Sequence, residues 1–222
     1  MKIIVTGSTG MVGKGALLES LDDPRVTQVL AINRNSVAMQ HPKLKEVIHK
    51  DFSDFTSIQA EFEDYDACFH CMGVSSAGMN EEQYTNLTYD ISLALATACY
   101  NANPKMVFNY VSGIGTDSSE QGRSMWARVK GKTENDILKL GFRKAFMFRP
   151  GAIRPMRGIK SRTKLYQAVY NIMGPFWGIF EWILSNNLTN TTKIGKAMIN
   201  SVEKDLEFIH LENPQINELA KP

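Results

Sequence analysis

The sequence is poor in the features that mark disulfide-rich, membrane and nucleic-acid-binding proteins. It has three cysteines in 222 residues, too few for a disulfide framework. The net charge at pH 7 is only +2 and no broad basic face with interleaved aromatics is evident, so we expect no nucleic-acid or membrane partner. The opening MKIIVTGSTG lacks the long apolar core of a secretory signal. These absences predict a cytoplasmic globular protein.

Two of the cysteines, Cys68 and Cys71, form a Cys-x-x-Cys pair with His70 between them. Redox pairs of this type lie at a helix N-terminus, where the helix dipole stabilises the thiolate. The surrounding ACFHCMG instead predicts a buried strand, in which the two cysteines point to opposite faces. Zinc would need further ligands, and the four histidines show no metal spacing. We therefore interpret the cysteines as small buried side chains and predict no metal site.

Short apolar segments alternate with longer helical ones, the pattern of βαβ units around a parallel sheet. We predict one Rossmann-type, doubly wound α/β domain over residues 1–222, with a mainly parallel sheet of six or seven strands and helices on both faces. Residues 154–222 add a smaller, substrate-side portion. The predicted strands are Ile3–Thr6, Gln28–Asn33, Val47–His49, Asp66–Cys71, Met106–Val111, Ala145–Arg149 and a last one at Leu206–Leu211. The predicted helices are Met11–Leu21, Ser53–Phe62 with Ser53 as N-cap, Glu81–Ala102, Ser124–Leu140 closed by Gly141, Lys164–Met173, Ile194–Val202 and Pro214–Leu219.

Two segments after Pro150 have more than one interpretation. The stretch GPFWGIFEWIL, 174–184, is too short for a membrane span, which needs ~20 apolar residues. It is consistent with core, with the wall of a cleft or with a dimer surface, so a homodimer stays among the expectations. The basic run of Arg154, Arg157, Lys160, Arg162 and Lys164 favours a solvated loop over contact with an anionic substrate or a cofactor phosphate.

The strongest motif is TGSTGMVG, which follows a predicted strand and opens a predicted helix. Gly7 permits the tight turn, Gly10 lets the backbone approach a pyrophosphate, and Gly13 lets the helix pack closely on the sheet. The helix N-terminus offers free N–H groups and partial positive charge to phosphates. We therefore predict a dinucleotide site that includes Gly7, Ser8, Thr9, Gly10, Met11, Val12 and Gly13.

The end of the second predicted strand indicates which dinucleotide binds. An NAD site usually has Asp or Glu there to bind the ribose 2′-hydroxyl. This chain has Asn33 and Arg34, with no acid between residues 31 and 44. The Arg34 guanidinium suits a 2′-phosphate, which predicts NADP(H) over NAD(H). We expect Asp51 and Phe52 to meet the adenine, and the pair Met72-Gly73 to pass beneath the adenosine.

These motifs, together with FNYVSGIGTDSS, VKGKTE and FRPG, resemble those of the atypical and extended short-chain dehydrogenase/reductases. The small NAD(P)-binding proteins of the Tat-interacting oxidoreductase-like and NAD-dependent epimerase/dehydratase-like groups are the most similar. The likeness covers residues 1 to about 155 and continues more weakly through TTKIGKAMIN. It implies that Lys130 and the Pro150-Gly151 pair also border the cofactor.

The resemblance implies acid–base catalysis by a Tyr-x-x-x-Lys pair, assisted by a serine at the end of the preceding strand. Lys130 matches the lysine, but the tyrosine position holds Trp126, and an indole is neither an acid nor a base near neutral pH. Ser112 matches the serine, with Thr116 and Ser124 as alternative hydroxyls.

Two functions remain open on this basis. One is an NADP(H)-dependent oxidoreductase that acts on a small apolar carbonyl or a quinone-like acceptor, which needs no acid from the enzyme. The other is a non-catalytic NADP(H)-binding sensor that works through protein contacts. A tyrosine of the 81–102 helix, Tyr84 or Tyr89, is a further candidate proton donor, although packing is the more common role there.

Overall fold

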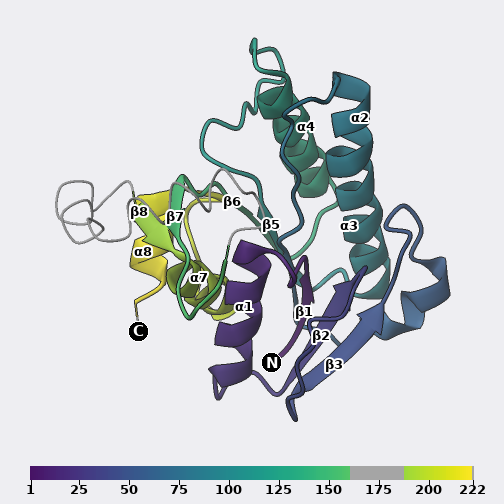
Figure 1. Cartoon of the computed structure of the whole chain (residues 1–222), viewed down its shortest axis with the longest axis vertical. Coiled ribbons are helices and arrows are strands. Elements are labelled where there is room, and N and C mark those ends of the chain that lie inside the picture. The colour runs from purple at the N-terminus through teal and green to yellow at the C-terminus, as the bar shows by residue number, and fades with distance from the viewer. Residues whose placement is uncertain (161–187, 222) are drawn as a thin grey trace.

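The fold is built on a parallel sheet with helices on both faces (Figure 1). The computed structural model describes residues 1–160 and 188–221. Its main sheet has seven strands in the order β3-β2-β1-β4-β5-β6-β9, and every neighbouring pair is parallel. This confirms the predicted fold class. The strands are β1 (Lys2–Thr6), β2 (Gln28–Asn33), β3 (Leu44–Ile48), β4 (Ala67–His70), β5 (Val107–Val111), β6 (Lys144–Phe148) and β9 (His210–Leu211), and a separate parallel pair consists of β7 (Ala152–Arg154) and β8 (Leu188–Asn190).

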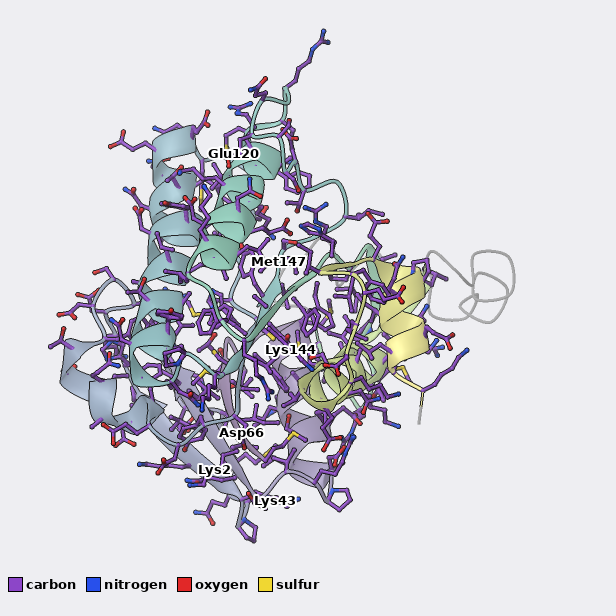
Figure 2. The ribbon with its side chains drawn as sticks, turned by 180° about the vertical axis from the view of Figure 1, so that it is seen from behind. Lys2, Lys43, Asp66, Glu120, Lys144 and Met147 are labelled. Carbon is purple, nitrogen blue, oxygen red and sulfur yellow. The ribbon has the colours of Figure 1, made fainter. Side chains whose placement is uncertain are left out.

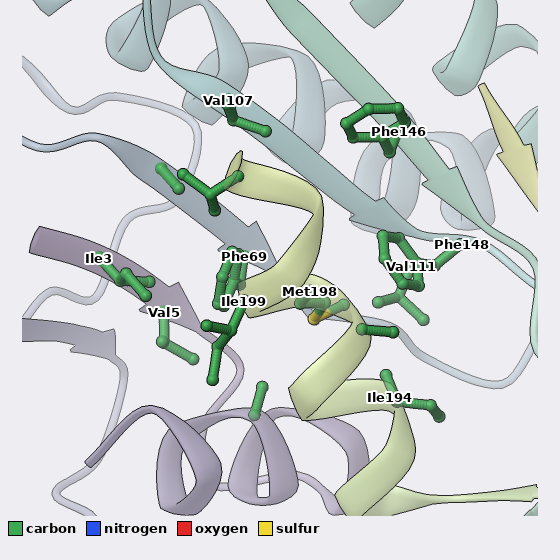
Figure 3. Close-up of a cluster of buried hydrophobic side chains, with 14 of the residues drawn as sticks. Ile3, Val5, Phe69, Val107, Val111, Phe146, Phe148, Ile194, Met198 and Ile199 are labelled. Atoms are coloured by element: carbon green, nitrogen blue, oxygen red, sulfur yellow. The ribbon is translucent and has the colours of Figure 1, made fainter. Parts of the chain in front are cut away.

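The two faces of the sheet carry different helices and separate apolar clusters. One face packs against α1 (Met11–Asp22), α7 (Thr191–Glu203) and α8 (Asn213–Leu219). The other packs against η1 (Thr56–Phe62), α3 (Ile91–Ala102) and α4 (Met125–Lys139). Alternation along β1 explains this division, because Ile3 and Val5 enter the first cluster and Ile4 enters the second. Figure 3 shows Ile3 and Val5 near side chains of α7.

The cysteines follow the same alternation. Cys68 lies in the cluster beneath α3, whereas Cys71 packs against the cluster beneath α1 and α7. All three cysteines are free. Burial raises the pKa of the Cys71 thiol, which keeps it protonated. The predicted role as a small buried side chain is confirmed for Cys68, whereas Cys71 is only partly buried.

Several predicted boundaries are wrong. The 53–62 segment is a 3₁₀ helix that begins at Thr56, and Ser53 does not cap it but bonds Asp51. The third strand begins earlier than Val47, at Leu44, and the last shrinks to His210–Leu211. The 81–102 helix contains a π turn, η2 (Asn86–Asp90), between α2 (Glu81–Thr85) and α3. Gly141 has φ of +85° after α4, as its predicted capping role requires. The predictions for Lys164–Met173 and for residues 174–184 lie outside the described residues.

The amino ends of the strands are held by polar bonds (Figure 2). The backbone N–H of Lys2 donates to Asp66 Oδ2 at 2.7 Å, and Lys43 Nζ donates to the carbonyl of Asp23 at 2.8 Å. In open parallel sheets a ligand binds at the opposite, carboxyl edge.

No helix within residues 1–160 and 188–221 is long and apolar enough to cross a membrane. Over the same residues, no three His, Cys, Asp or Glu side chains gather in a way that would hold a metal ion.

Candidate functional site

The turn between β1 and α1 leaves no room for a side chain at two of its glycines. Gly7 has φ of +70°, and a Cβ built there would lie 2.7 Å from the carbonyl oxygen of Cys71. A Cβ on Gly13 would lie 2.3 Å from the carbonyl oxygen of Gly7. Both distances are far below van der Waals contact. The backbone therefore forms the closed glycine cradle that fits a dinucleotide pyrophosphate.

Helix α1 begins directly above this cradle. Gly10 occupies its N-cap position in extended conformation, and no side chain caps the first turn. The N–H groups of Met11, Val12 and Gly13 therefore have no acceptor inside the helix. The first turn also carries no acidic residue. Free N–H groups with the positive end of the helix dipole favour a phosphate at this point.

Ser8 and Asn33, both predicted to bind the cofactor, form hydrogen bonds with each other. Asn33 Nδ2 donates to Ser8 Oγ at 2.7 Å, and the backbone N–H of Ser8 donates to Asn33 Oδ1 at 3.1 Å. Both residues are buried. This reciprocal pair ties the glycine turn to the end of β2, so the Asn33 side chain orders the cradle.

A pocket of about 140 Å³ opens beside the cradle, at the carboxyl ends of β1, β2 and β4. Eight of the residues predicted to bind the cofactor line it: Gly7, Thr9, Gly10, Asn33, Arg34, Phe52, Met72 and Gly73. The others are Asn35, Cys71, Val74, Leu87 and Ile91. We will refer to this cavity as the adenosine pocket. Leu87 and Ile91 were missed from the sequence, and their signal was the apolar i, i+4 spacing on the 81–102 helix.

Arg34 and Asp51 take different positions at this pocket. Arg34 lies at its edge with an exposed side chain, and no described residue forms a hydrogen bond or ion pair with its guanidinium. Asp51 does not line the pocket, because Oδ1 accepts from the Ser53 N–H at 2.9 Å and hydroxyl at 2.5 Å. These two bonds lower the pKa of Asp51. Phe52 lines the pocket, and the contact of Asp51 with adenine stays a prediction.

Lys130 on α4 and His70 at the end of β4 lie near the carboxyl end of β5. We refer to these two side chains as the polar floor of the site. Lys130 Nζ donates to the carbonyl of Ser112, and burial lowers the pKa of Lys130 to about 8 against the opposing effect of Glu134. His70 bonds Thr6 Oγ1 at 2.7 Å and, through its other ring nitrogen, Ser92 Oγ at 2.9 Å. Burial, together with the charge of Lys130, lowers the pKa of His70 to about 3. The imidazole is therefore neutral at physiological pH.

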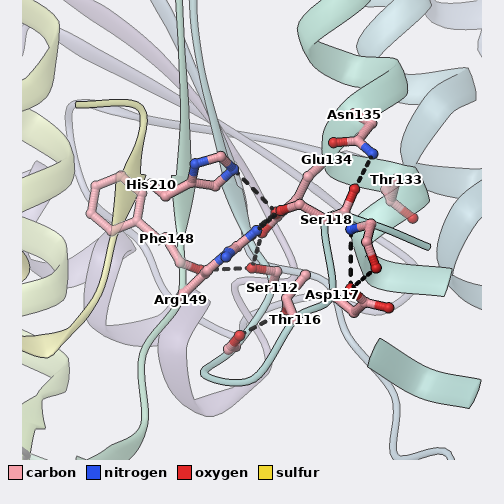
Figure 4. Close-up of polar contacts among 12 residues, drawn as sticks. Ser112, Thr116, Asp117, Ser118, Thr133, Glu134, Asn135, Phe148, Arg149 and His210 are labelled. Atoms are coloured by element: carbon pink, nitrogen blue, oxygen red, sulfur yellow. Dashed lines mark hydrogen bonds and ion pairs between the residues drawn. The ribbon is translucent and has the colours of Figure 1, made fainter. Parts of the chain in front are cut away.

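The predicted catalytic serine is part of a buried ionic network (Figure 4). Ser112 Oγ donates to Glu134 Oε1 at 2.5 Å, and the Glu134 side chain is fully buried. Arg149 pairs with the same carboxylate, with Nε 3.0 Å from Oε1, and its Nη2 also reaches Glu134 and Ser118 Oγ. His210 Nε2 lies 3.4 Å from Glu134 Oε2. The Ser112 hydroxyl is thus bound to a carboxylate instead of pointing freely toward a substrate.

Sequence reasoning missed Glu134 and Arg149. Glu134 is one helical turn after Lys130 in VKGKTE, and Arg149 is the arginine of FRPG, so both stand inside motifs that were noticed. The helix position was the available signal, since residues at i and i+4 share one helix face. That the two meet could only be seen once α4 was packed against the end of β6.

Trp126 lies on the first turn of α4 against the loop after β5. Its Cη2 atom is 3.6 Å from where a Cβ on Gly115 would lie. In the same loop, Thr116 Oγ1 donates to the carbonyl of Gly113 at 2.7 Å. Ser124 occupies the N-cap position of α4 without capping it. Around the tyrosine position of the family, the structure therefore places an indole and a hydroxyl that is already bonded.

The remaining predicted residues are accounted for as follows. The FRPG segment leads from the end of β6 to β7. The Pro150 carbonyl accepts from the Ile114 N–H, and the Gly151 N–H donates to Asn213 Oδ1 at 3.1 Å. Tyr84 is only 2% exposed, and burial raises the pKa of its phenol. Tyr89 OH donates to Asp136 at 2.8 Å on the outer side of α4.

Comparison with known proteins agrees with this geometry. The family model described as the NAD dependent epimerase/dehydratase family matches residues 3–123. The mitochondrial protein fmp52 of Emericella nidulans is 28% identical over 212 residues, which cover 92% of this chain and 88% of the relative. Mitochondrial FMP52 of Meyerozyma guilliermondii is 29% identical over 155 residues, 69% of this chain and 65% of the relative.

The fold also matches solved structures. UDP-glucuronic acid 4-epimerase from Bacillus cereus, crystallised with NAD, superposes with a TM-score of 0.68 at 14% sequence identity, over 96% of this chain and 78% of that one.

One expectation is corrected by these relatives. The cytoplasmic location predicted from the absence of a signal is contradicted, because the relatives are named as mitochondrial proteins. The opening residues form β1 of the domain and were therefore a poor guide to the compartment. On the match over more than half its length, and with the glycine cradle in place, the chain belongs to the NAD dependent epimerase/dehydratase family and has the NAD-binding fold of the extended short-chain dehydrogenase/reductases.

Proposed function

We propose that this protein is an NADP(H)-dependent oxidoreductase of the atypical short-chain type. The observation that supports NADP(H) is the Arg34 guanidinium at the edge of the adenosine pocket, which pairs with no residue that the structure describes. The first acid after the second strand, Glu46, accepts from the Ser36 hydroxyl at 2.6 Å and the Val37 N–H at 2.8 Å. It is therefore committed to the loop and does not serve a ribose 2′-hydroxyl. An arginine without a nearby free acid favours a 2′-phosphate.

Different residues would bind different parts of the cofactor. The glycine cradle and the first turn of α1 would hold the pyrophosphate, and Phe52, Met72 and Gly73 would border the adenosine. Lys130, in the position of the family lysine, would hold the nicotinamide ribose and orient it beside the end of β5. When bound, the cofactor supplies a hydride, which carries two electrons to the acceptor.

The proposed acceptor class follows from the absence of a free proton donor among the described residues of the site. Trp126 offers no acidic proton, and the Ser112 hydroxyl is bound to Glu134. An acceptor that gains its proton from water needs only to be positioned against the cofactor. Quinones and conjugated apolar carbonyls meet this condition, and the Trp126 indole supplies an apolar wall for them. We therefore propose a small apolar or quinone-like acceptor.

The test is calorimetric titration with NADPH, NADP, NADH and NAD of the wild type and of Arg34→Ala. We expect NADPH binding to weaken about tenfold or more in the variant, because a charge-assisted hydrogen bond contributes ~1.5–3 kcal/mol. NADH binding should change little. Arg143→Ala, which removes an exposed arginine at the opposite edge of the sheet, is the control. If the wild type binds none of the four dinucleotides, the proposed function is wrong.

A second candidate is a non-catalytic NADP(H)-binding sensor. The same two observations support it, since the family's tyrosine is Trp126 and its serine hydroxyl is engaged. An acceptor screen that follows NADPH oxidation separates the two. Acceptor-dependent oxidation above the rate without protein supports the oxidoreductase. Tight NADPH binding with no oxidation across quinones and conjugated carbonyls supports the sensor.

A further inference from the structure

A second pocket, of about 420 Å³, lies on the other side of the glycine turn from the adenosine pocket. Three stretches of chain build it: Thr9, Gly10, Lys14 and Leu18 from the turn and α1, Ser36 and Val37 from the loop after β2, and residues 157–160 from the segment after β7. The two pockets share Thr9 and Gly10. Between them runs the loop 33–37, which gives Asn33, Arg34 and Asn35 to one pocket and Ser36 and Val37 to the other.

The lining of this second pocket carries uncompensated positive charge. The side-chain ammonium groups of Lys14 and Lys160 form no hydrogen bond or ion pair with any residue that the structure describes. Arg157 is different, because it pairs with Glu19 at 3.2 Å and with Asp22 at 2.8 Å on α1. It therefore acts as a brace that fixes the 157–160 segment beside α1, and the two lysines supply the net charge.

The opposite wall of the pocket is rigid. The carboxylate of Glu46 accepts from the Ser36 hydroxyl and the Val37 N–H, at 2.6 and 2.8 Å. The Ser36 hydroxyl in turn accepts from the N–H of Ala38 at 3.0 Å, and Ala38 has φ of +51°. Glu46 thus holds the loop with one hydrogen bond to each of its carboxylate oxygens. A ligand between this wall and α1 would meet the two ammonium groups and the uncapped first turn of the helix.

We propose that Lys14 and Lys160 bind the 2′-phosphate of NADP(H), as a pair of cations opposite Arg34. This assignment rests on the proposed function and extends it. The two pockets meet at Thr9 and Gly10. In this proposal the adenosine fills the adenosine pocket with its ribose at these shared residues, so that a substituent at the 2′ position would lie at the border of the lysine-lined pocket. A phosphate monoester carries ~1.5–2 negative charges at pH 7, which two unpaired lysines match. The basic run that begins at Arg154, which we interpreted from the sequence as a solvated loop, would then include a cofactor contact at Lys160.

The experiment measures the affinity of Lys14→Ala, Lys160→Ala and the double variant for NADPH and NADH, with adenosine 2′,5′-bisphosphate and 5′-AMP as fragments. We expect each single change to weaken NADPH and the bisphosphate about three- to tenfold, and the double change more, with NADH and 5′-AMP unaltered. These values correspond to partly exposed charge pairs. The slope of NADPH affinity against salt should also become shallower. Lys105→Ala, an exposed lysine at the amino edge of the sheet, controls for the loss of one positive charge.

Other outcomes are equally informative. An unchanged ratio of NADPH to NADH affinity in the double variant overturns the assignment, whereas failure of the wild type to bind either dinucleotide overturns the proposed function itself. Inorganic phosphate that binds to the wild type saturated with NADPH as tightly as to the free protein would show that the lysines hold a separate phosphate, and would also overturn the assignment. Because Lys160 is exposed and Lys14 is only partly buried, the variants should keep the wild-type circular dichroism spectrum.

Discussion

The buried carboxylate of Glu134 should matter to stability far more than any surface acid of the same helix. Its side chain is fully buried and receives the guanidinium of Arg149, whose own side chain is 13% exposed. Removing one member of a buried ion pair leaves the other charge without a partner and costs ~3–5 kcal/mol. The Ser112 hydroxyl loses its acceptor at the same time. We therefore predict that Glu134→Ala lowers the free energy of unfolding by about 3–5 kcal/mol.

Asp136, two residues further along α4, provides the matched control. Its carboxylate pairs with Lys132 at 2.8 Å and Lys139 at 2.7 Å, and those lysine side chains are 47% and 73% exposed. Solvent screens such pairs, so each contributes only ~0.2–1 kcal/mol. Asp136→Ala removes a carboxylate of similar size from the same helix, together with the acceptor of the Tyr89 hydroxyl, and we expect it to cost about 1–2 kcal/mol.

Urea unfolding of both variants, followed by circular dichroism, measures the difference. A protein of ordinary stability, ~5–15 kcal/mol, has enough reserve for Glu134→Ala to be examined. If that variant does not fold, Glu134→Gln keeps the shape and one acceptor oxygen and should give an intermediate loss. The double variant Glu134→Leu and Arg149→Met should recover much of the lost stability, because neither buried charge is then left without a partner. Equal shifts of the urea midpoint for Glu134→Ala and Asp136→Ala would refute the argument.

Two pH effects follow from the floor of the site. In the unfolded chain His70 becomes protonated near pH 6.5, whereas the native ring, with its pKa lowered to about 3, stays neutral. The free energy of unfolding should therefore fall as the pH drops from 6.5 toward 3. Urea melts at stepwise lower pH should show a smaller fall for His70→Gln. Lys130, with its pKa lowered from 10.5 to about 8, acts in the same sense but over a higher pH range. Its buried charge costs stability below pH 8, and this cost should vanish as the pH rises to 10.5. Lys130→Met should thus be about 1–3 kcal/mol more stable than the wild type at pH 7 in the same melts, while binding NADPH more weakly.

The central strands could be predicted from the sequence because they are buried on both faces, and an apolar run then marks them directly. All five residues of β5 are buried, and its predicted end at Val111 is correct. The outer strand β3 is half-exposed, and its mixed pattern LKEVI hid its start. The 53–62 segment failed for another reason. Asp51 binds Ser53 and Asp54 binds Thr56, and such side-chain bonds to nearby backbone compete with an α-helix.

The same distinction applies to the candidate site. The glycine turn is encoded locally, since close backbone approach forces glycine at fixed spacing, and its residues were identified correctly in position. The Glu134–Arg149 pair joins α4 to the end of β6, and the lysine-lined pocket joins three stretches between residues 9 and 160. No local pattern specifies such meetings. The side-chain state of Ser112 was equally hidden, because its motif position is that of the family while its hydroxyl is bound to a carboxylate.

The loss of the family's tyrosine and the engagement of its serine are therefore linked features of one site. Releasing the Ser112 hydroxyl would leave a buried acceptor on Glu134 short of a bond, at a cost of ~1–3 kcal/mol. Arg149 holds that carboxylate in place from the other side. A tyrosine at position 126 by itself would consequently lack its serine partner, and both would have to change for tyrosine-dependent chemistry to return. Lys130 occupies the position of the family's lysine, and its ammonium group donates to the carbonyl of Ser112 directly after β5. This arrangement is the reason that we propose hydride transfer to an acceptor that takes its proton from water.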